Sequence, residues 1–132
     1  MKSIIEELKN KRDFYSEKGA TAEQIESAEK ELKLKFAEDY KEYLLQFGTV
    51  SCGGHELTGF SADASLDVVH VTIENIKCNP NIKKSFYVIE ETHIDGIVIW
   101  QSESGEIYSA EYKDEPQRIY GSLAEYIATF EE

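Results

Sequence analysis

The chain has few of the residues that cross-link or interrupt a fold. Its 132 residues include two cysteines and two prolines, with no low-complexity tract and no evident repeat. Two cysteines cannot form a disulfide framework, and in a cytosolic chain they are more often reduced and buried than bridged. The absence of any linker-like stretch predicts one compact domain over residues 1–132.

Long apolar runs are also missing. The first segment, MKSIIEELKNKR, carries charges in every turn and lacks an apolar core of signal-peptide length. No later run approaches the roughly 20 apolar residues of a membrane span. We therefore expect a cytoplasmic protein with no membrane partner.

The usual signatures of enzyme and metal chemistry do not occur. The serines lack a Gly-x-Ser-x-Gly elbow, and there is no Gly-x-Gly-x-x-Gly or phosphate-binding loop. Cys52-x-x-His55 has the spacing of half a zinc site, but structural zinc needs four ligands and no second close pair follows. His93-x-Asp95 suits a polar turn as well as a metal. We expect no catalytic residue, metal or cofactor, although among 26 acidic residues a pair spaced for glycosidase chemistry stays open.

Acidic charge is abundant and unevenly distributed. The net charge is −12; residues 1–84 hold 15 acidic and 12 basic side chains, whereas residues 85–132 hold 11 and 2. Such a surface repels nucleic acid and anionic lipid, and it speeds association with a basic partner. An excess of carboxylates that only keeps the protein soluble would explain the same charge equally well. The charge therefore indicates where a basic partner would bind, but not whether there is one.

Helical periodicity dominates the first half of the chain. An apolar stripe predicts a helix over about residues 2–17, and a Thr21–Gln24 capping box predicts another from near Ala22. Tyr40, Tyr43, Leu44 and Phe47 fall at i, i+3, i+4 and i+7, so they predict a third helix that Gly48 ends in the left-handed conformation. Their aromatic rings are expected in the core.

The next segment predicts a change of structure. Val68, Val69 and Val71 favour a brief strand, after which Thr72 is placed to cap a short helix. From residue 86 the period becomes that of strands: Phe86–Glu90, Ile94–Gln101 and Glu106–Tyr112 predict an antiparallel meander. A capping box at Ser122 and Glu125 begins a closing helix. The fold class is α+β, with N-terminal helices packed on a small antiparallel sheet and a C-terminal helix returning to it.

These elements resemble the SUKH superfamily, which includes a fungal regulator of cell-wall synthesis and many bacterial immunity proteins. The family's helical segment has the form Ile-x-x-x-Glu-x-x-Leu-Gly-x-x-Leu-Pro-x-Asp-Tyr-x-x-Phe-Leu, followed by Gly-Gly. Lys33 stands where that glycine is usual and Ala37 where the proline is. The matching residues are Ile25, Glu29, Leu32, Asp39, Tyr40, Tyr43, Leu44, Gly53 and Gly54.

The resemblance implies stoichiometric binding without chemistry: the domain occupies a cognate toxin, often a nuclease, and blocks it. A nuclease presents cations around its site to hold phosphates, so carboxylates of the final third are the candidates for contact. They are Glu90, Glu91, Asp95, Glu103, Glu106, Glu111, Asp114 and Glu115. The Cys52–Gly59 loop is a secondary candidate. A regulatory scaffold for an endogenous protein and a small carboxylate-dependent enzyme stay as alternatives.

Overall fold

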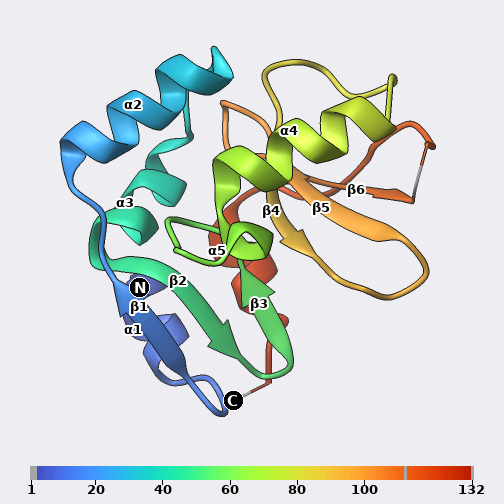
Figure 1. Cartoon of the computed structure of the whole chain (residues 1–132). Coiled ribbons are helices and arrows are strands. Elements are labelled where there is room, and N and C mark those ends of the chain that lie inside the picture. Colours follow the sequence, from blue (N-terminus) through green and yellow to red (C-terminus); the bar gives the residue numbers. More distant parts are fainter. Residues whose placement is uncertain (1–2, 112, 132) are drawn as a thin grey trace.

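Two antiparallel sheets organise the chain. The computed structural model describes residues 3–111 and 113–131. The first sheet has the order β1-β2-β3, formed by Tyr15–Lys18, Phe47–Cys52 and His55–Leu57. The second has the order β4-β5-β6-β7, formed by Tyr87–Glu91, Ile97–Gln101, Ile107–Glu111 and Gln117–Tyr120. Figure 1 shows the two sheets with helices packed around them, which confirms the α+β class.

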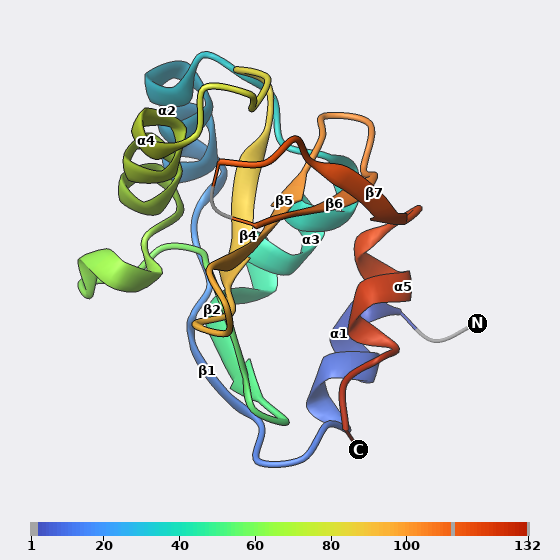
Figure 2. The same ribbon diagram turned by 90° about the vertical axis from the view of Figure 1, so that its right-hand side faces the viewer.

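Helices cover both faces of the second sheet. The α-helices in the described ranges are α1 (Ile4–Lys9), α2 (Ala22–Leu32), α3 (Glu38–Gln46), α4 (Val68–Cys78) and α5 (Leu123–Ile127). In Figure 2, α2 and α4 lie on one side of this sheet, and α1, α3 and α5 lie on the other. The larger apolar core lies between the sheet and α3 and α5, and a smaller one lies under α4 around Trp100.

The helical aromatics form the larger core, as predicted. Tyr40 and Tyr43 are fully buried, and their rings stack with centroids 5.4 Å apart. The Tyr43 hydroxyl donates to the Thr58 carbonyl at 2.9 Å, and the Tyr40 hydroxyl lies 3.0 Å from Thr58 Oγ1. Burial raises the pKa of both phenols above its usual value, so these groups stay neutral. Buried phenols therefore fasten α3 to the segment that follows β3.

The prediction of one helix over about residues 2–17 is wrong. Helix α1 ends at Lys9, Asp13 takes a positive φ of 55°, and the chain turns into β1. Strand β1 pairs antiparallel with β2, with Tyr15 opposite Ser51. Local periodicity cannot reveal this pairing because the paired residues lie 29 to 36 positions apart in the sequence.

The segment after residue 67 is also corrected. Residues Val68–Cys78 form one helix, α4, and not a strand followed by a helix. Asp67 is its N-cap, because its Oδ2 accepts the N–H of His70 at 3.1 Å. Thr72 is instead buried, and its hydroxyl accepts the N–H of Val88 at 3.0 Å. The valines therefore pack a helix on the sheet, and tertiary burial outweighs their strand propensity.

Gly48 does not end α3 in the left-handed conformation. Helix α3 stops at Gln46 and Phe47 enters β2 directly. Gly48 is required for close approach, since a Cβ there would lie 2.4 Å from the Lys18 carbonyl oxygen. The left-handed position belongs to Lys33, which ends α2 with φ 58°.

The meander and the closing helix are confirmed. Strands β4, β5 and β6 pair in sequence, and a further strand, β7, lies beyond them at the edge. Tyr112, predicted to end a strand, lies outside the described residues. Ser122 caps α5 through the N–H of Glu125, whereas the Glu125 carboxylate accepts from Gly121. Within the described ranges, no helix has the length and apolar character needed to cross a bilayer.

Candidate functional site

Five of the eight candidate carboxylates lie at one end of the second sheet. The β4–β5 hairpin and the β6–β7 loop both turn at this end, because neighbouring strands are antiparallel. At this end of the sheet, the first pair of residues facing each other across β5 and β6 is Ile97 and Glu111. We call this group the acidic sheet end; it comprises Glu91, Asp95, Glu111, Asp114 and Glu115.

The acidic sheet end also exposes large apolar side chains. Ile94 at the hairpin tip is 63% exposed, and Ile119 on β7 is 41% exposed. A hollow of about 460 Å³ lies beside Ile119 and Ile97, bordered by the carboxylates of Glu111, Asp114 and Glu115. Apolar groups ringed by charge are typical of protein interfaces. This arrangement therefore fits a partner that carries both apolar and basic groups.

A second, smaller hollow lies on the opposite face of the same sheet end. It opens between α4 and the β4–β5 hairpin, and Asn75, Glu91, Ile97 and Trp100 are among its lining residues. The Asn75 amide donates to Glu91 Oε2 at 3.0 Å. Ile97 borders both hollows, so the apolar surface continues around the end of the strand. Trp100 is 1% exposed and belongs to the core, so it forms the floor of this hollow and not an exposed anchor.

Glu103 and Glu106 lie at the opposite end of the strands. The turn between β5 and β6 carries both of them. Glu103 Oε2 accepts the main-chain N–H of Lys35 at 2.6 Å, and Glu106 pairs with Arg118 at 3.1 Å. These two carboxylates therefore hold the turn and β7 in place, and they are not part of the acidic sheet end.

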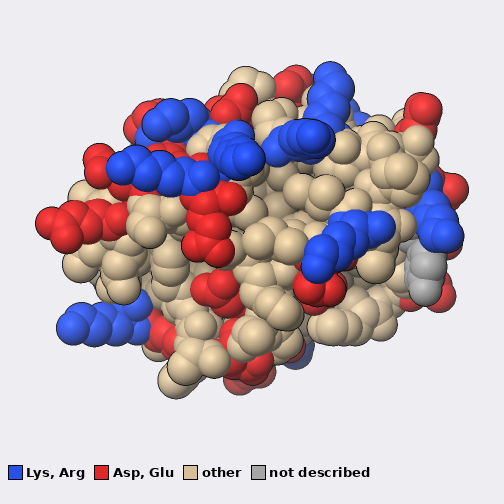
Figure 3. Space-filling view, turned by 45° about the horizontal axis from the view of Figure 1, so that its top comes forward, with Lys and Arg blue, Asp and Glu red and all other residues tan. Residues whose placement is uncertain are grey.

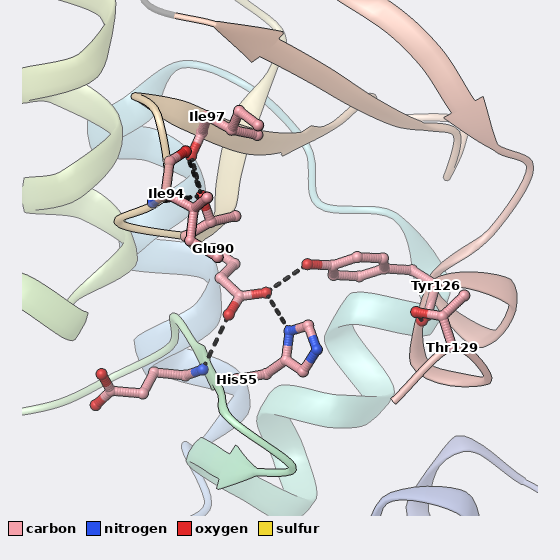
Figure 4. A network of polar contacts seen from close by, with 8 residues as sticks. His55, Glu90, Ile94, Ile97, Tyr126 and Thr129 are labelled. Atoms are coloured by element: carbon pink, nitrogen blue, oxygen red, sulfur yellow. Dashed lines mark hydrogen bonds and ion pairs between the residues drawn. The ribbon is translucent and has the colours of Figure 1, made fainter. Parts of the chain in front are cut away.

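Glu90 differs from the other candidates because its side chain is buried. It is 3% exposed, and its carboxylate accepts hydrogen bonds from the Tyr126 hydroxyl and from the N–H of Glu56 at 3.0 Å. His55 Nδ1 lies 2.9 Å from the same carboxylate, and Figure 4 shows the three groups converging on it. Glu90 thus connects β3, β4 and α5 inside the molecule, where a docking partner cannot reach it.

The Cys52–Gly59 loop is built into this network. The His55 ring stacks on Phe130, with centroids 3.7 Å apart. Cys52 is buried, and desolvation raises the pKa of its thiol to about 11. Among the described residues, no three His, Cys, Asp or Glu side chains gather as metal ligands. The loop geometry thus explains Cys52 and His55 as packing residues.

Basic side chains and carboxylates are interspersed over much of the surface. In Figure 3 several Lys and Arg side chains gather along the upper part of the molecule, with Asp and Glu side chains among and below them. Exposed lysines lie in the last turns of α2 and α4 and in the segments that follow these helices, at Lys30, Lys33, Lys35, Lys77, Lys83 and Lys84. Lys113 is an exposed cation of the β6–β7 loop, next to Asp114 and Glu115.

Comparison with known families agrees with the sequence resemblance. The family model SUKH_5, described as SMI1-KNR4 cell-wall, matches residues 1–130. The chain belongs to the SUKH family. A search of curated proteins finds no match. The family assignment therefore fixes the scaffold of this SUKH domain, and the site has to be argued from its own residues.

The motif residues of this SUKH domain serve the scaffold. Glu29 is buried, and its Oε2 accepts the N–H of Phe36 at 2.8 Å, which fixes the loop between α2 and α3. Ala37 replaces the proline of the motif, and its N–H donates to the Tyr87 hydroxyl at 2.9 Å. Proline would lack this donor. The family pattern therefore does not include the acidic sheet end.

Sequence reasoning missed the apolar part of the site. Ile94 was predicted to begin the strand Ile94–Gln101, but it lies in the turn before β5, which starts at Ile97. Ile119 lies in β7, a strand that was not predicted. The β-branched and aromatic pair Ile119-Tyr120, between Pro116 and Gly121, was the available signal for that strand, although a short one.

Proposed function

We propose that this SUKH domain is an immunity protein that binds a cognate toxin in the cytoplasm and neutralises it without catalysis. The observation that carries the proposal is the acidic sheet end, where five carboxylates lie at the same end of the sheet as exposed Ile94 and Ile119, and three of them border the hollow beside Ile119. A toxin that acts on nucleic acid must hold phosphates, and the cations that do so complement such a surface.

The remaining polar groups support a binding role over an enzymatic one. The buried Glu90 carboxylate already accepts from several donors and is committed to joining three elements. The buried phenols and the Cys52 thiol are kept neutral by desolvation, and a nucleophile requires the opposite shift. Apolar anchors with a charged rim are what association requires.

Co-expression with a toxin is the direct test. For an immunity protein the toxin gene is expected beside this one, as the C-terminal domain of a large secreted protein, and that domain is the candidate to test. The wild-type chain should restore growth and co-purify with that domain. A sheet-end variant with amides at the five carboxylates should restore growth poorly. Absence of both rescue and complex would overturn the proposal.

A matched variant controls for net charge. It carries glutamine at five exposed carboxylates of helices α1, α2 and α3, namely Glu6, Glu23, Glu26, Glu31 and Glu42. The change in net charge equals that of the sheet-end variant. Rescue by this control, together with loss in the sheet-end variant, would assign binding to the sheet end and not to overall acidity.

A regulatory scaffold is the second candidate, because the description of the matched family names the cell wall. In that case the same surface would bind an endogenous basic protein. Growth or cell-wall defects after deletion of this gene alone, with no toxin present, would favour the scaffold over the immunity role.

A further inference from the structure

The outer edge of the second sheet is open. Strand β7 pairs with β6 and ends the sheet, and within the described part of the chain no strand lies beyond it. The turn, loop and cap hydrogen bonds of that part include none to the main chain of Gln117–Tyr120. Such a row of unpaired N–H and C=O groups is a template for another strand.

The opposite edge of this sheet is closed. Strand β4 lies against the segment that follows β3, and the N–H of Thr58 donates to the Ile89 carbonyl at 2.8 Å. The first sheet has its own open edge at β1, and both edge strands pair with a shift in register, between Ser16 and Lys18 in β1 and between Arg118 and Tyr120 in β7. The β7 edge differs from the β1 edge because it lies beside the hollow that Glu111, Asp114 and Glu115 border.

The surroundings of β7 specify the chemistry of an added strand. Ile119 on β7 borders the hollow that Glu111, Asp114 and Glu115 surround. Side chains of a strand laid beside β7 would alternate between the two faces of the sheet. On one face they would meet Ile119, and near Gln117 they would meet the carboxylates.

Protection of the edge is partial. Arg118 is held by Glu106 at 3.1 Å, and Pro116 precedes the strand. Charged residues and prolines of this kind discourage random pairing of edges. The register of β7 also shifts at Ile119, between the pairs Ile107–Tyr120 and Tyr108–Arg118, and such an irregularity likewise discourages random pairing. The Ile119 side chain is nevertheless 41% exposed, so a selective partner can contact it.

We infer that β7 is a β-addition site that takes an extended basic segment of the partner protein, with apolar residues over Ile119 and cations beside Glu111, Asp114 and Glu115. Main-chain pairing would supply affinity, and the hollow and the carboxylates would supply selectivity. This inference rests on the proposed function for the identity of the partner, but not for the binding mode.

A synthetic peptide tests the binding mode without any toxin. The probe is a ten-residue peptide in which valine alternates with lysine, titrated into the ¹⁵N-labelled full chain. Amides of Gln117–Tyr120 should shift and should exchange with solvent at least about tenfold more slowly, as strand pairing requires. Amides of Tyr15–Lys18 on the β1 edge should not change. A peptide with N-methyl groups at four consecutive residues, which cannot pair, should bind at least about tenfold more weakly.

Two protein variants complete the design. Ile119→Lys places a cation at the hollow and should weaken binding of the peptide about tenfold, whereas Tyr15→Lys on the β1 edge should leave it unchanged. Ile119 and Tyr15 are both exposed, so neither change disturbs the core. Equal binding of the N-methylated peptide, or shifts confined to residues outside β7, would overturn the inference, as would absence of binding. Peptide binding with no toxin complex would instead count against the immunity role alone.

Discussion

Asp39 and Leu123 are joined by a hydrogen bond of 2.9 Å, in which Asp39 Oδ2 accepts the main-chain N–H at the start of α5. The other oxygen, Oδ1, accepts from Gln101 Nε2, also at 2.9 Å. One carboxylate of the SUKH motif therefore connects α3, β5 and α5. The motif residue is a structural junction, and it positions the sheet on which the candidate site lies.

Replacement of Asp39 should destabilise the whole domain. Asp39→Ala leaves the Leu123 N–H and the Gln101 amide without their acceptor, and we expect a loss of about 2–3 kcal/mol in the free energy of unfolding. Asp39→Asn keeps one acceptor and should lose less. Urea unfolding measures both. Glu42→Ala, an exposed change on the same helix, is the control and should stay within about 0.5 kcal/mol of wild type.

Glu90→Gln should also be destabilising, because Glu90 is a buried structural residue. Its amide cannot accept from His55, Glu56 and Tyr126 together, and we expect a loss of about 2–4 kcal/mol in urea unfolding. Exposed Glu111→Gln should be nearly neutral. If Glu90→Gln proved as stable as Glu111→Gln, the interior network would have no structural importance.

Lys33→Gly should stabilise the protein. Lys33 holds a left-handed conformation that costs a residue with a Cβ roughly 1–2 kcal/mol, and glycine removes most of that cost. We expect a gain of about 1 kcal/mol in the free energy of unfolding. Lys30→Gly, in the right-handed last turn of α2, should cost about as much as Lys33→Gly gains. If both variants changed the free energy of unfolding in the same direction, the left-handed conformation of Lys33 would be contradicted.

Alkaline pH should destabilise the fold through Cys52. Burial raises the pKa of its thiol from 9.0 to about 11, so the folded state favours the protonated form. Its contribution is complete below pH 9 and is lost as pH rises to about 11, because the unfolded thiol ionises first. Unfolding free energies measured from pH 8 to 11 should fall less steeply for Cys52→Ser. If the unfolding free energies of the wild type and Cys52→Ser fell in parallel with pH, this contribution of Cys52 would be excluded.

The two thiols should react differently. Cys52 is buried, whereas Cys78 at the end of α4 is exposed. A thiol reagent at pH 8 should label Cys78 rapidly and label Cys52 only on unfolding, since reaction requires an accessible thiolate. Mass spectrometry of the labelled peptides measures both rates. Rapid labelling of Cys52 in the folded protein would contradict its burial.

Local chemistry made part of the fold predictable. The Thr21–Gln24 capping box is present with both of its hydrogen bonds, at 3.1 and 2.8 Å. The runs of β-branched and aromatic residues between turn residues correctly predicted β4 to β6. The predictions that failed concern segments whose secondary structure depends on partners distant in the sequence. Tyr15–Lys18 is a strand only because β2 pairs with it, and Val68–Cys78 is a helix because its valines are buried against the sheet.

The candidate site was predictable in charge but not in geometry. Sequence alone identified the acidic final third, yet it could not separate buried Glu90 from exposed Glu111. The same count of charges included Glu103 and Glu106, which the strand directions place at the far end of the sheet. Strand order decides which carboxylates are neighbours, and it became known only from the structure.

The central claim, that a basic toxin docks on the acidic sheet end, is tested most directly by association kinetics with the purified toxin domain. The wild-type chain, the five-carboxylate sheet-end variant and the matched variant with glutamine at five helix carboxylates are compared at two salt concentrations. We predict at least about tenfold slower association and a weaker salt dependence for the sheet-end variant alone. Equal rates and equal salt dependence for both variants would contradict the account.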